Sequence, residues 1–371
     1  MVDRVGGLRP FQLEPARRAR ISREIAYNLA SMTVQVRSFA KINLGLRIGA
    51  ARTDGFHELL TVYQTIGLHD LIRVSLSRGN GIEIRCSDPR VPKKESNTCY
   101  RIAEKTMQAL KAKGRILVEI EKRLPVQGGM GGASANAVAT LLALEKVVKK
   151  NLPAEERLRI AAEVGSDLPL FLVGGTVLGV GRGEQVYPLP DLPQTPCVVV
   201  TPAVGVSTPN AFGEWDRRTQ GAGTSALVGL SAAAGKGKLR QLTLPGPSDR
   251  MVELGREFSA WLSESYSGAP FRRGRAENPL LALVRAGIKN DFEEVVFPEY
   301  PELSEGKHAL ERAGAKYASL SGSGSTLYGL FASKAAARAA AAKLRGQGWA
   351  AQATVTLTRQ KYWAKFLVPS F

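Results

Sequence analysis

Hydrophobic and polar positions alternate most clearly just after the first thirty residues. From Thr33 to Ile48, apolar or small residues stand at every second position and are separated mainly by polar ones. A period of two is typical of a β-strand with one buried face. The sequence therefore predicts a long, half-buried strand from Thr33, followed by a turn at Gly49–Gly55 with Asp54-Gly55 as its tight corner.

Shorter segments of both kinds follow along the chain. Strands are predicted at Leu71–Leu76, Ile82–Arg85, Leu117–Glu121, Val173–Val180, Cys197–Thr201 and Leu327–Phe331. Helices are predicted at Asn97–Lys113, Ala133–Lys149, Pro153–Val164, Pro301–Ala313 and Lys334–Arg345. Proline opens the third of these helices and glycine follows it, as is usual at helix ends. This mixture favours an α+β protein of two domains.

Composition shifts divide the chain. Residues 1–32 lack periodicity and are predicted to be an N-terminal extension outside the fold, or the result of a start codon placed too early; their acidic residues weaken the case for a transit peptide. The first domain is predicted at 33–188 and the second at 197–371, with proline-rich Tyr187–Pro196 as the linker. A weakly periodic insertion around 214–277 fits a substrate-side flap, a partner surface or a loose insertion equally well.

Charge adds one constraint to this picture. Lys and Arg total 51 of the 371 residues against 33 acidic residues, a net charge of +18. The excess favours an anionic partner, although a basic host proteome explains it equally well. The basic residues are spread out without aromatic interleaving, which disfavours nucleic acid relative to a small polyphosphate.

The cysteines, histidines and apolar runs disfavour disulfide-bonded, zinc-binding and membrane proteins. The three cysteines are scattered, which predicts a reducing cytoplasm without disulfides, and no histidine pair or histidine–cysteine pair has the spacing of a zinc site. No apolar run approaches the roughly 18 residues of a membrane helix, so no membrane association is expected. No exposed apolar face can be identified, and no oligomeric state is predicted.

The stretch Leu124–Ala137, LPVQGGMGGASANA, places four glycines in five positions directly before a predicted helix. Glycine exposes backbone N–H groups, and the helix N-terminus adds a partial positive charge, so together they form an anion site. A tight structural turn is the alternative, but the density of glycine favours phosphate. The loop is neither a Walker A loop nor a G-x-G-x-x-G loop.

Three further features fit phosphoryl transfer, which needs positive charge and a group that orients the acceptor hydroxyl. Lys41 and Asn43 project from the same strand face, and Asp167 lies in GSDLPLFL after a helix end. A second glycine cluster, SLSGSGST at Ser319–Thr326, lies between a predicted helix and a strand. Taken alone, the strand residues also fit a solvated sheet face, and the aspartate fits an ordinary turn.

Six segments together resemble the signature motifs of the GHMP kinase superfamily. They are SFAKINLGLRI, RTDGFHELLTVYQ, KRLPVQGGMGGASANA, GSDLPLFL, VSTPNAF and ASLSGSGSTLYGLF, spread discontinuously from Thr33 to the C-terminus. Within the superfamily they are most similar to the 4-diphosphocytidyl-2-C-methyl-D-erythritol kinases of the non-mevalonate isoprenoid route, because AKIN is followed by DGFH. The resemblance implies two domains with the active site in the cleft between them.

The resemblance also implies an ATP- and Mg²⁺-dependent transfer of a phosphoryl group to the 2-hydroxyl of a cytidine diphosphate substrate. Asp167 would be the catalytic base, and Lys41 would keep it ionised and help orient the hydroxyl. Asn43 would contact the substrate, and Phe56 and His57 would recognise the cytidine, although His57 also fits a core histidine. The ATP-binding residues implied are Pro125, Val126, Gln127, Gly128, Gly129, Met130, Gly131, Gly132, Ala133 and Ser134. Those implied to close the substrate side are Gly322, Ser323 and Gly324. No magnesium ligands are assigned.

The glycine motif departs from the family pattern. Gln127 and Ala133 stand where glycine is usual, and Ala135 replaces a second serine, which leaves Ser134 as the hydroxyl of the motif. Two alternatives to the leading function remain: another GHMP kinase of homoserine or mevalonate type, and a catalytically silent basic binding protein on the same scaffold. The presence of both Lys41 and Asp167 argues against the silent protein.

Overall fold

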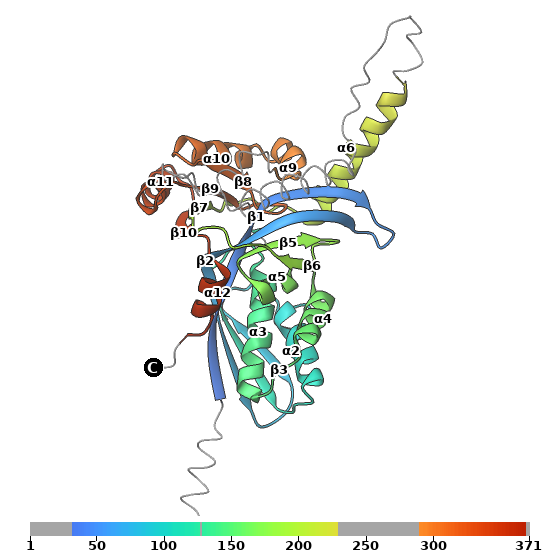
Figure 1. The fold of residues 1–371 in the computed structure, drawn as a ribbon, viewed down its shortest axis with the longest axis vertical. Helices are drawn as coiled ribbons and strands as arrows, with labels where there is room; N and C mark the ends of the chain where they lie inside the picture. The colour runs from blue at the N-terminus through green and yellow to red at the C-terminus, as the bar shows by residue number, and fades with distance from the viewer. Residues whose placement is uncertain (1–31, 127, 229–288, 369–371) are drawn as a thin grey trace, which may run out of the picture.

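The computed structural model describes residues 32–126, 128–228 and 289–368. The predicted extension up to residue 31, Gln127 and the insertion beyond residue 228 lie outside the described residues. Two β-sheets with helices packed on them form the rest of the molecule (Figure 1).

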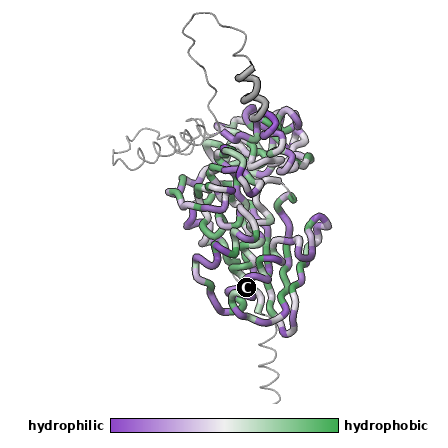
Figure 2. Tube along the Cα trace, turned by 90° about the vertical axis from the view of Figure 1, so that its right-hand side faces the viewer, coloured by the Kyte–Doolittle hydropathy of each residue, from purple (hydrophilic) through white to green (hydrophobic). Residues whose placement is uncertain are grey.

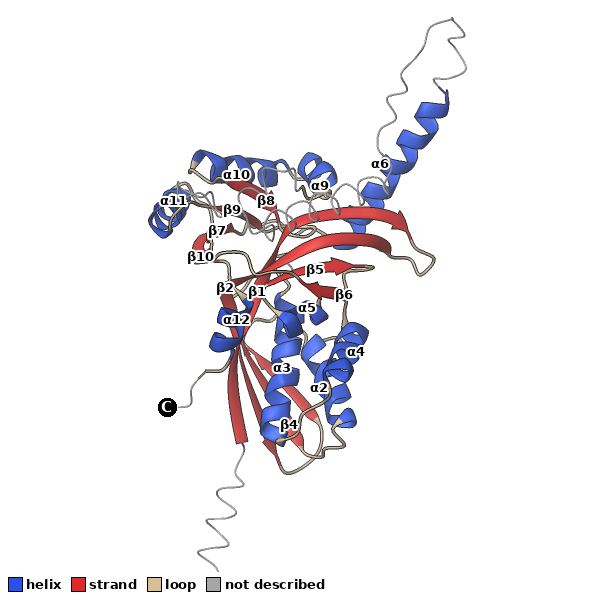
Figure 3. Cartoon of the chain, viewed as in Figure 1, coloured by secondary structure: helices blue, strands red, loops and turns tan. Residues whose placement is uncertain are grey.

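The first sheet has six strands among the described residues, built around a long antiparallel hairpin. Its strands are β1 (Met32–Ala51), β2 (His57–Ser77), β3 (Ile82–Cys86), β4 (Arg115–Glu121), β5 (Thr176–Val180) and β6 (Gln185–Pro188). One half of β2 pairs with β4 and the other half with β5 (Figure 3). Strand β3 runs parallel to β4. The predicted turn forms with Gly55 at φ +81°, but it begins later than Gly49, because β1 continues to Ala51.

Strand β1 is buried on both faces from Ser38 to Ile48, so the prediction of a half-buried strand is wrong. Apolar side chains of Ala40, Ile42 and Leu44 pack against the second sheet. The opposite face holds Lys41 and Asn43, which are also buried, because the glycine loop covers them. The alternation therefore separates an apolar face from a face that carries polar side chains, and both faces are buried.

Helices cover one face of the first sheet (Figure 1). They are α2 (Thr98–Ala109), α3 (Gly132–Val148), α4 (Ala154–Val164) and α5 (Leu168–Val173). Helix α2 begins where Asn97 accepts a hydrogen bond from the Cys99 amide, and it ends four residues before the predicted Lys113. The strand predicted from Val173 starts three residues late, because Val173 ends α5 and two glycines with positive φ follow it.

The second sheet is antiparallel, with the order β10-β7-β9-β8. Its strands are β7 (Pro196–Val200), β8 (Tyr317–Leu320), β9 (Leu327–Leu330) and β10 (Ala351–Val355), and its helices are α9 (Glu293–Glu299), α10 (Pro301–Arg312) and α11 (Lys334–Gly346). Hydrophobic and hydrophilic stretches alternate along the chain (Figure 2), as expected when each element buries one face. The last helix, α12 (Arg359–Phe366), returns to the first sheet, where Tyr362 packs on Phe39.

Three further segments differ from the sequence expectation. Helix α6 (Thr208–Val228) occupies part of the region predicted to be weakly periodic, and its Trp215 is buried in the core of the second sheet. The predicted linker begins inside β6, and its Leu189 and Leu192 are buried between the two sheets. The connection between the sheets is therefore packed. The first half of β2 was missed because most of it is continuously buried and does not alternate.

Candidate active site

Lys41 and Asp167, predicted from distant parts of the sequence, lie together. The Lys41 Nζ atom is 3.6 Å from Asp167 Oδ2 and donates a 2.7 Å hydrogen bond to Asn43 Oδ1. Lys41 is 3% exposed, whereas the Asp167 side chain is 34% exposed. Burial lowers the pKa of Lys41, and the nearby Asp167 carboxylate partly offsets this effect. A buried cation thus faces a carboxylate that solvent and substrate can reach.

Two neighbours fix the Asp167 carboxylate. Asp167 directly precedes α5, whose first residues Leu168 and Pro169 are buried and anchor the turn. The Tyr63 hydroxyl donates a 3.0 Å hydrogen bond to Asp167 Oδ1. Burial, and then the nearby carboxylate, raise the pKa of Tyr63 well above its usual value, so this hydroxyl keeps its proton. Sequence analysis missed Tyr63, which is one aromatic among the apolar residues of HELLTVYQ.

Asn43 orients the lysine in this structure. Its Nδ2 donates to the Thr61 hydroxyl at 2.8 Å, and that hydroxyl donates to the Gly45 carbonyl, so it can only accept from Asn43. The amide is therefore fixed with Oδ1 toward Lys41. The predicted contact of Asn43 with substrate stays a prediction.

The first glycine loop packs directly on Lys41. The Lys41 amide donates to the Met130 carbonyl at 3.0 Å. Gly129 and Gly131 adopt φ values of +74° and +67°, which residues with a side chain rarely adopt. A Cβ atom on Gly131 would lie 2.9 Å from Phe171 Cζ and 3.1 Å from Lys41 Cγ. The loop therefore needs glycine for its backbone angles and for its approach to the lysine.

We expect Gly131→Ala to lower kcat sharply and to destabilise the protein by more than about 1 kcal/mol. The methyl group would strain the backbone and displace Lys41 from Asp167. Steady-state kinetics and thermal unfolding measure both effects. Gly346→Ala is the matched control, because Gly346 lies in α11 with no atom within 4 Å of its Cβ position. Wild-type kcat in Gly131→Ala would contradict this account of the loop.

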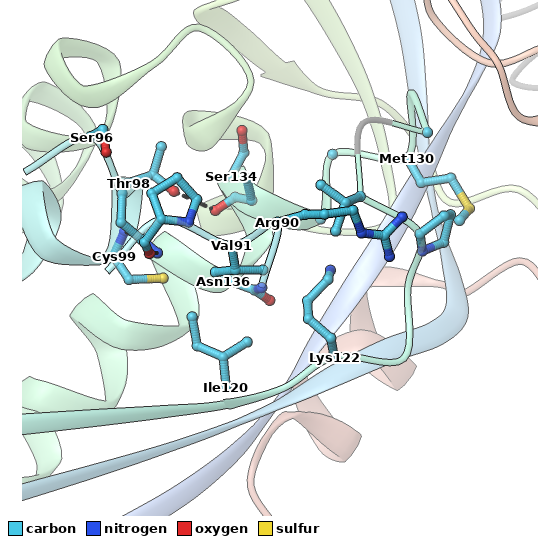
Figure 4. Close-up of a pocket in the computed structure, with 18 of the residues that line it drawn as sticks. Arg90, Val91, Ser96, Thr98, Cys99, Ile120, Lys122, Met130, Ser134 and Asn136 are labelled. Carbon is cyan, nitrogen blue, oxygen red and sulfur yellow. Dashed lines mark hydrogen bonds between the residues drawn. The ribbon is translucent and has the colours of Figure 1, made fainter. Parts of the chain in front are cut away.

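A cavity of about 350 Å³ opens beside this loop (Figure 4). One wall holds the nine predicted ATP residues that the structure describes, Pro125, Val126 and Gly128–Ser134. The other walls include Arg90, Thr98 and Lys122. Figure 4 shows the Arg90 side chain extending toward Met130, with the Lys122 side chain below it. Helix α3 begins at Gly132, so its positive end faces the cavity. The arrangement suits a polyanion.

The buried carboxylate of Asp70, which the sequence analysis missed, binds the residues just before this loop. Asp70 is fully buried, and its Oδ1 accepts from the Arg123 and Leu124 amides at 2.7 and 2.8 Å. Its Oδ2 accepts from Lys122 Nζ at 2.6 Å and from Asn136 Nδ2 at 2.9 Å. These bonds tie the end of β4 to α3 on either side of the glycine loop. Nothing in the local sequence distinguishes this aspartate from a surface residue.

The second glycine cluster closes over the lysine. Gly322 and Gly324 have φ values of +61° and +100°, and a Cβ on Gly322 would lie 3.5 Å from Lys41 Nζ. The Ser321 hydroxyl donates to the Gly129 carbonyl at 3.1 Å, which joins the two glycine loops. The Ser323 hydroxyl lies 2.7 Å from that of Thr208 at the start of α6. The site is thus built by loops from both sheets.

Asn290 and Glu293, beside the start of α9, support this second loop, and the sequence analysis missed both. Asn290 Nδ2 donates to the carbonyls of Leu320 and Gly322 at 2.9 and 2.8 Å. Glu293 accepts from the Leu320 amide at 2.9 Å. Asp291 forms a buried 2.8 Å ion pair with Arg47 of β1. The segment Asn290–Glu293 connects the loop to β1.

Phe56 and His57 lie at the far end of the same hairpin. His57 Nε2 is 2.7 Å from Asp216 Oδ1, and its ring stacks on Phe212 at 4.8 Å with an interplanar angle of 11°. Phe56 is 49% exposed, and the Arg182 guanidinium lies 4.9 Å from its ring centroid. His57 is 8% exposed. Phe212 belongs to VSTPNAF, but sequence analysis assigned it no role.

This aromatic cluster is separated from the Lys41–Asp167 pair along β2. His57 is six residues from Tyr63 on the same strand, a separation of about 20 Å at the rise of an extended strand. Both side chains point to the same face, because their positions differ by six, an even number. One face of the hairpin therefore carries the Lys41–Asp167 pair at one position and the aromatic cluster farther along.

Within the described residues, no three His, Cys, Asp or Glu side chains gather as a metal site, and no helix is long and apolar enough to cross a bilayer.

Comparison with known proteins matches these features to one family. Residues 97–175 match the GHMP kinases N terminal domain, and residues 275–349 match the GHMP kinases C terminal domain. The 4-diphosphocytidyl-2-C-methyl-D-erythritol kinase of Solibacter usitatus is 37% identical over 296 residues, 80% of each chain. That of Acaryochloris marina is 33% identical over 82% of this chain and 89% of its own. This chain belongs to the 4-diphosphocytidyl-2-C-methyl-D-erythritol kinase family.

Solved structures agree with this membership in the GHMP kinases. A crystal structure of 4-(cytidine 5'-diphospho)-2C-methyl-D-erythritol kinase has a TM-score of 0.63 at 26% identity and covers 87% of this chain and 98% of its own. The mevalonate kinase of L. major has a TM-score of 0.60 at 16% identity, covers 89% of this chain and 97% of its own, and shows the fold alone. The predicted α+β architecture of a two-domain GHMP kinase is confirmed. The exact domain boundaries stay a prediction.

Proposed function

We propose that this family member transfers the γ-phosphoryl group of ATP to the 2-hydroxyl of 4-diphosphocytidyl-2-C-methyl-D-erythritol. The observation that carries the proposal is the placement of Asp167 beside a buried lysine and next to a glycine loop at a helix N-terminus. The named relatives, at 30–37% identity, support the choice of substrate. Homoserine and mevalonate kinases share the fold at under 20% identity, which supports no particular acceptor.

The geometry of three side chains supports this reaction. Tyr63 occupies Asp167 Oδ1, so Oδ2 takes the proton from the substrate 2-hydroxyl. That hydroxyl oxygen attacks the γ-phosphorus, and the bond from the γ-phosphorus to the β–γ bridging oxygen breaks. ADP leaves with the electron pair of this bond. The Lys41 ammonium, fixed by Asn43, stabilises the negative charge that builds up on the transferred group.

The nucleotide would occupy the cavity beside the first glycine loop. Its triphosphate would lie against the free amides of the loop and of the first turn of α3, where the helix dipole favours negative charge. Lys122, which is paired with Asp70, and Arg90, which is paired with Asp88, line the cavity walls, and their remaining N–H groups can donate to phosphate oxygens. Because the loop packs closely on Lys41, it would place the γ-phosphate near the lysine.

Magnesium fits this arrangement as a partner of the triphosphate. Mg²⁺ keeps several waters and is usually held by phosphates with one or two protein oxygens. Ser134 in the first turn of α3 is the protein oxygen donor that we propose for it. Bound Mg²⁺ would neutralise charge on the β- and γ-phosphates.

The cytidine would bind at the aromatic end of the hairpin. A polyol and a cytosine separated by a diphosphate and a ribose can span the distance from Asp167 to His57. Phe56 and Phe212 offer ring faces, and His57 and Asp216 offer polar groups for the base edge. We place the reaction in the cytoplasm, where the three cysteines, all free in the structure, stay reduced.

We expect His57→Ala to raise the KM for the cytidine substrate about tenfold, the effect of losing about 1.4 kcal/mol of binding. The KM for ATP should not change, because the nucleotide cavity lies elsewhere on the molecule. Initial rates at varied concentrations of each substrate measure both constants. His308→Ala, at an exposed histidine of α10, is the matched control. An unchanged KM for the cytidine substrate would mean that His57 is only a packed core histidine.

Phosphorus NMR of the product tests the function itself. Incubation with ATP, Mg²⁺ and the cytidine substrate should produce ADP and a new phosphomonoester signal, with the diphosphate of the substrate intact. A product phosphorylated elsewhere, or inorganic phosphate alone, would contradict the proposal.

A further inference from the structure

The Asp167 carboxylate has one hydrogen-bond partner that the structure shows among its described residues, the Tyr63 hydroxyl at 3.0 Å. Lys41 does not take that place, because its Nζ is 3.6 Å away and is hydrogen-bonded to Asn43. Asp167 is also partly exposed and sits at a turn. Tyr63 therefore fixes one oxygen of this carboxylate by a hydrogen bond, while the Lys41 ammonium attracts the other.

Tyr63 can hold this position only because Gly183 has no side chain. A Cβ atom on Gly183 would lie 2.5 Å from the Tyr63 hydroxyl oxygen and 3.9 Å from Asp167 Oδ1. Tyr63 is 2% exposed on β2, so its ring cannot swing aside without disturbing the core. The hydroxyl thus fits into a space bounded by this glycine and Asp167.

The turn that carries Gly183 is itself tied to the hairpin. It connects β5 and β6, and the Gly183 amide donates to the Val180 carbonyl at 3.0 Å. The Leu59 amide of β2 donates to the Gly181 carbonyl at 2.6 Å. Glu184 accepts from the Arg182 amide at 2.7 Å. These bonds fix the distance between Gly183 and Tyr63.

We propose that Tyr63 and Gly183 form a positioning pair for the catalytic base. Tyr63 holds Asp167 Oδ1, which leaves Oδ2 for the acceptor hydroxyl, and Gly183 keeps the place of the Tyr63 hydroxyl open. The proposal rests on the proposed function, in which Asp167 is the base. Neither residue contacts the reacting atoms, so both act through Asp167.

A double-mutant cycle tests the pair. Tyr63→Phe removes the hydroxyl alone, and we expect kcat to fall roughly ten- to a hundredfold with both KM values unchanged, as for the loss of a hydrogen bond to a charged group. Gly183→Ala should lower kcat to a similar degree by displacing the hydroxyl. In the double variant the losses should not multiply, because no hydroxyl remains to be displaced.

Matched controls separate positioning from stability. Gly348→Ala introduces a methyl group at a similar φ of +91° with no atom within 4 Å, so it carries the backbone strain without the clash. Tyr187→Phe removes a hydroxyl from a tyrosine that is 53% exposed. Both should keep wild-type kcat. A Tyr63→Phe enzyme with kcat within twofold of wild type, or losses that multiply in the double variant, would overturn the proposal.

A second readout distinguishes failure of this proposal from failure of the proposed function. The side-chain carboxyl ¹³C signal of Asp167, assigned by its disappearance in Asp167→Asn, should shift in the same direction in Tyr63→Phe and Gly183→Ala. This measurement needs no substrate. If wild type turns over no cytidine substrate, the proposed function fails, and the carboxyl signal still decides whether Tyr63 and Gly183 hold Asp167. An unshifted signal in both variants would contradict the pair.

Discussion

Replacing Asp167 by Asn is expected to lower kcat by about three orders of magnitude while ATP affinity stays within about twofold. An amide has no basic oxygen that could take the proton of the acceptor hydroxyl, and general base catalysis contributes about 10²–10⁴-fold. The nucleotide cavity is lined by other residues, so binding of ATP should persist. Initial-rate kinetics and calorimetric titration with ATP measure the two effects separately.

The control for this variant is Glu163→Gln, which removes one negative charge from the exposed face of α4. It should keep wild-type kcat and ATP affinity. If Asp167→Asn keeps more than a tenth of wild-type kcat, Asp167 is no base, and its closeness to Lys41 has only structural meaning. If ATP affinity falls together with kcat, the aspartate acts chiefly in binding the nucleotide.

Asp291→Ala should destabilise the fold by about 3–5 kcal/mol, the cost of leaving a buried charge without its partner. Arg47 and Asp291 form a 2.8 Å ion pair, and their side chains are only 8% and 0% exposed. The second Asp291 oxygen accepts from the Ile48 amide, which would also lose its bond. Urea unfolding followed by circular dichroism measures the change in the free energy of unfolding.

Glu156→Gln provides the matched comparison, because it breaks an ion pair with Arg159 on the surface of α4. Solvent screens such a pair, so the urea midpoint should not move measurably. Equal midpoints for Asp291→Ala and Glu156→Gln would show that the buried pair contributes no more than a surface pair. The connection between β1 and the segment Asn290–Glu293 would then have to come from the other bonds.

Local patterns predicted the strand that carries Lys41 and the helix that follows the first glycine loop, but not the short helix α5 beside Asp167. Alternation from Thr33 located β1, and the glycines of Leu124–Ala137 located the start of α3 within one residue. Both signals are local, because the strand period and the helix start depend on neighbours a few positions away. The roles of Lys41 and Asp167 came from motif resemblance, and the structure places the two side chains 3.6 Å apart.

Contacts between distant residues could not be predicted in this way. Tyr63 meets Asp167 across 104 positions, and Arg47 meets Asp291 across 244. A single sequence contains no record of such pairs, and each partner alone resembles an ordinary strand or turn residue. Asp70 is the extreme case, since it is fully buried although its neighbours suggest a surface turn. Tertiary packing decides the role of each.

Release of ADP by the purified protein, with ATP, Mg²⁺ and one acceptor at a time, tests the central claim most directly. The acceptors are 4-diphosphocytidyl-2-C-methyl-D-erythritol, homoserine and mevalonate, each compared with Asp167→Asn as the blank. We predict ADP release with the cytidine substrate alone and none above the blank with the other two. Release with homoserine or mevalonate instead, or with none of the three, would contradict the function proposed for Lys41 and Asp167.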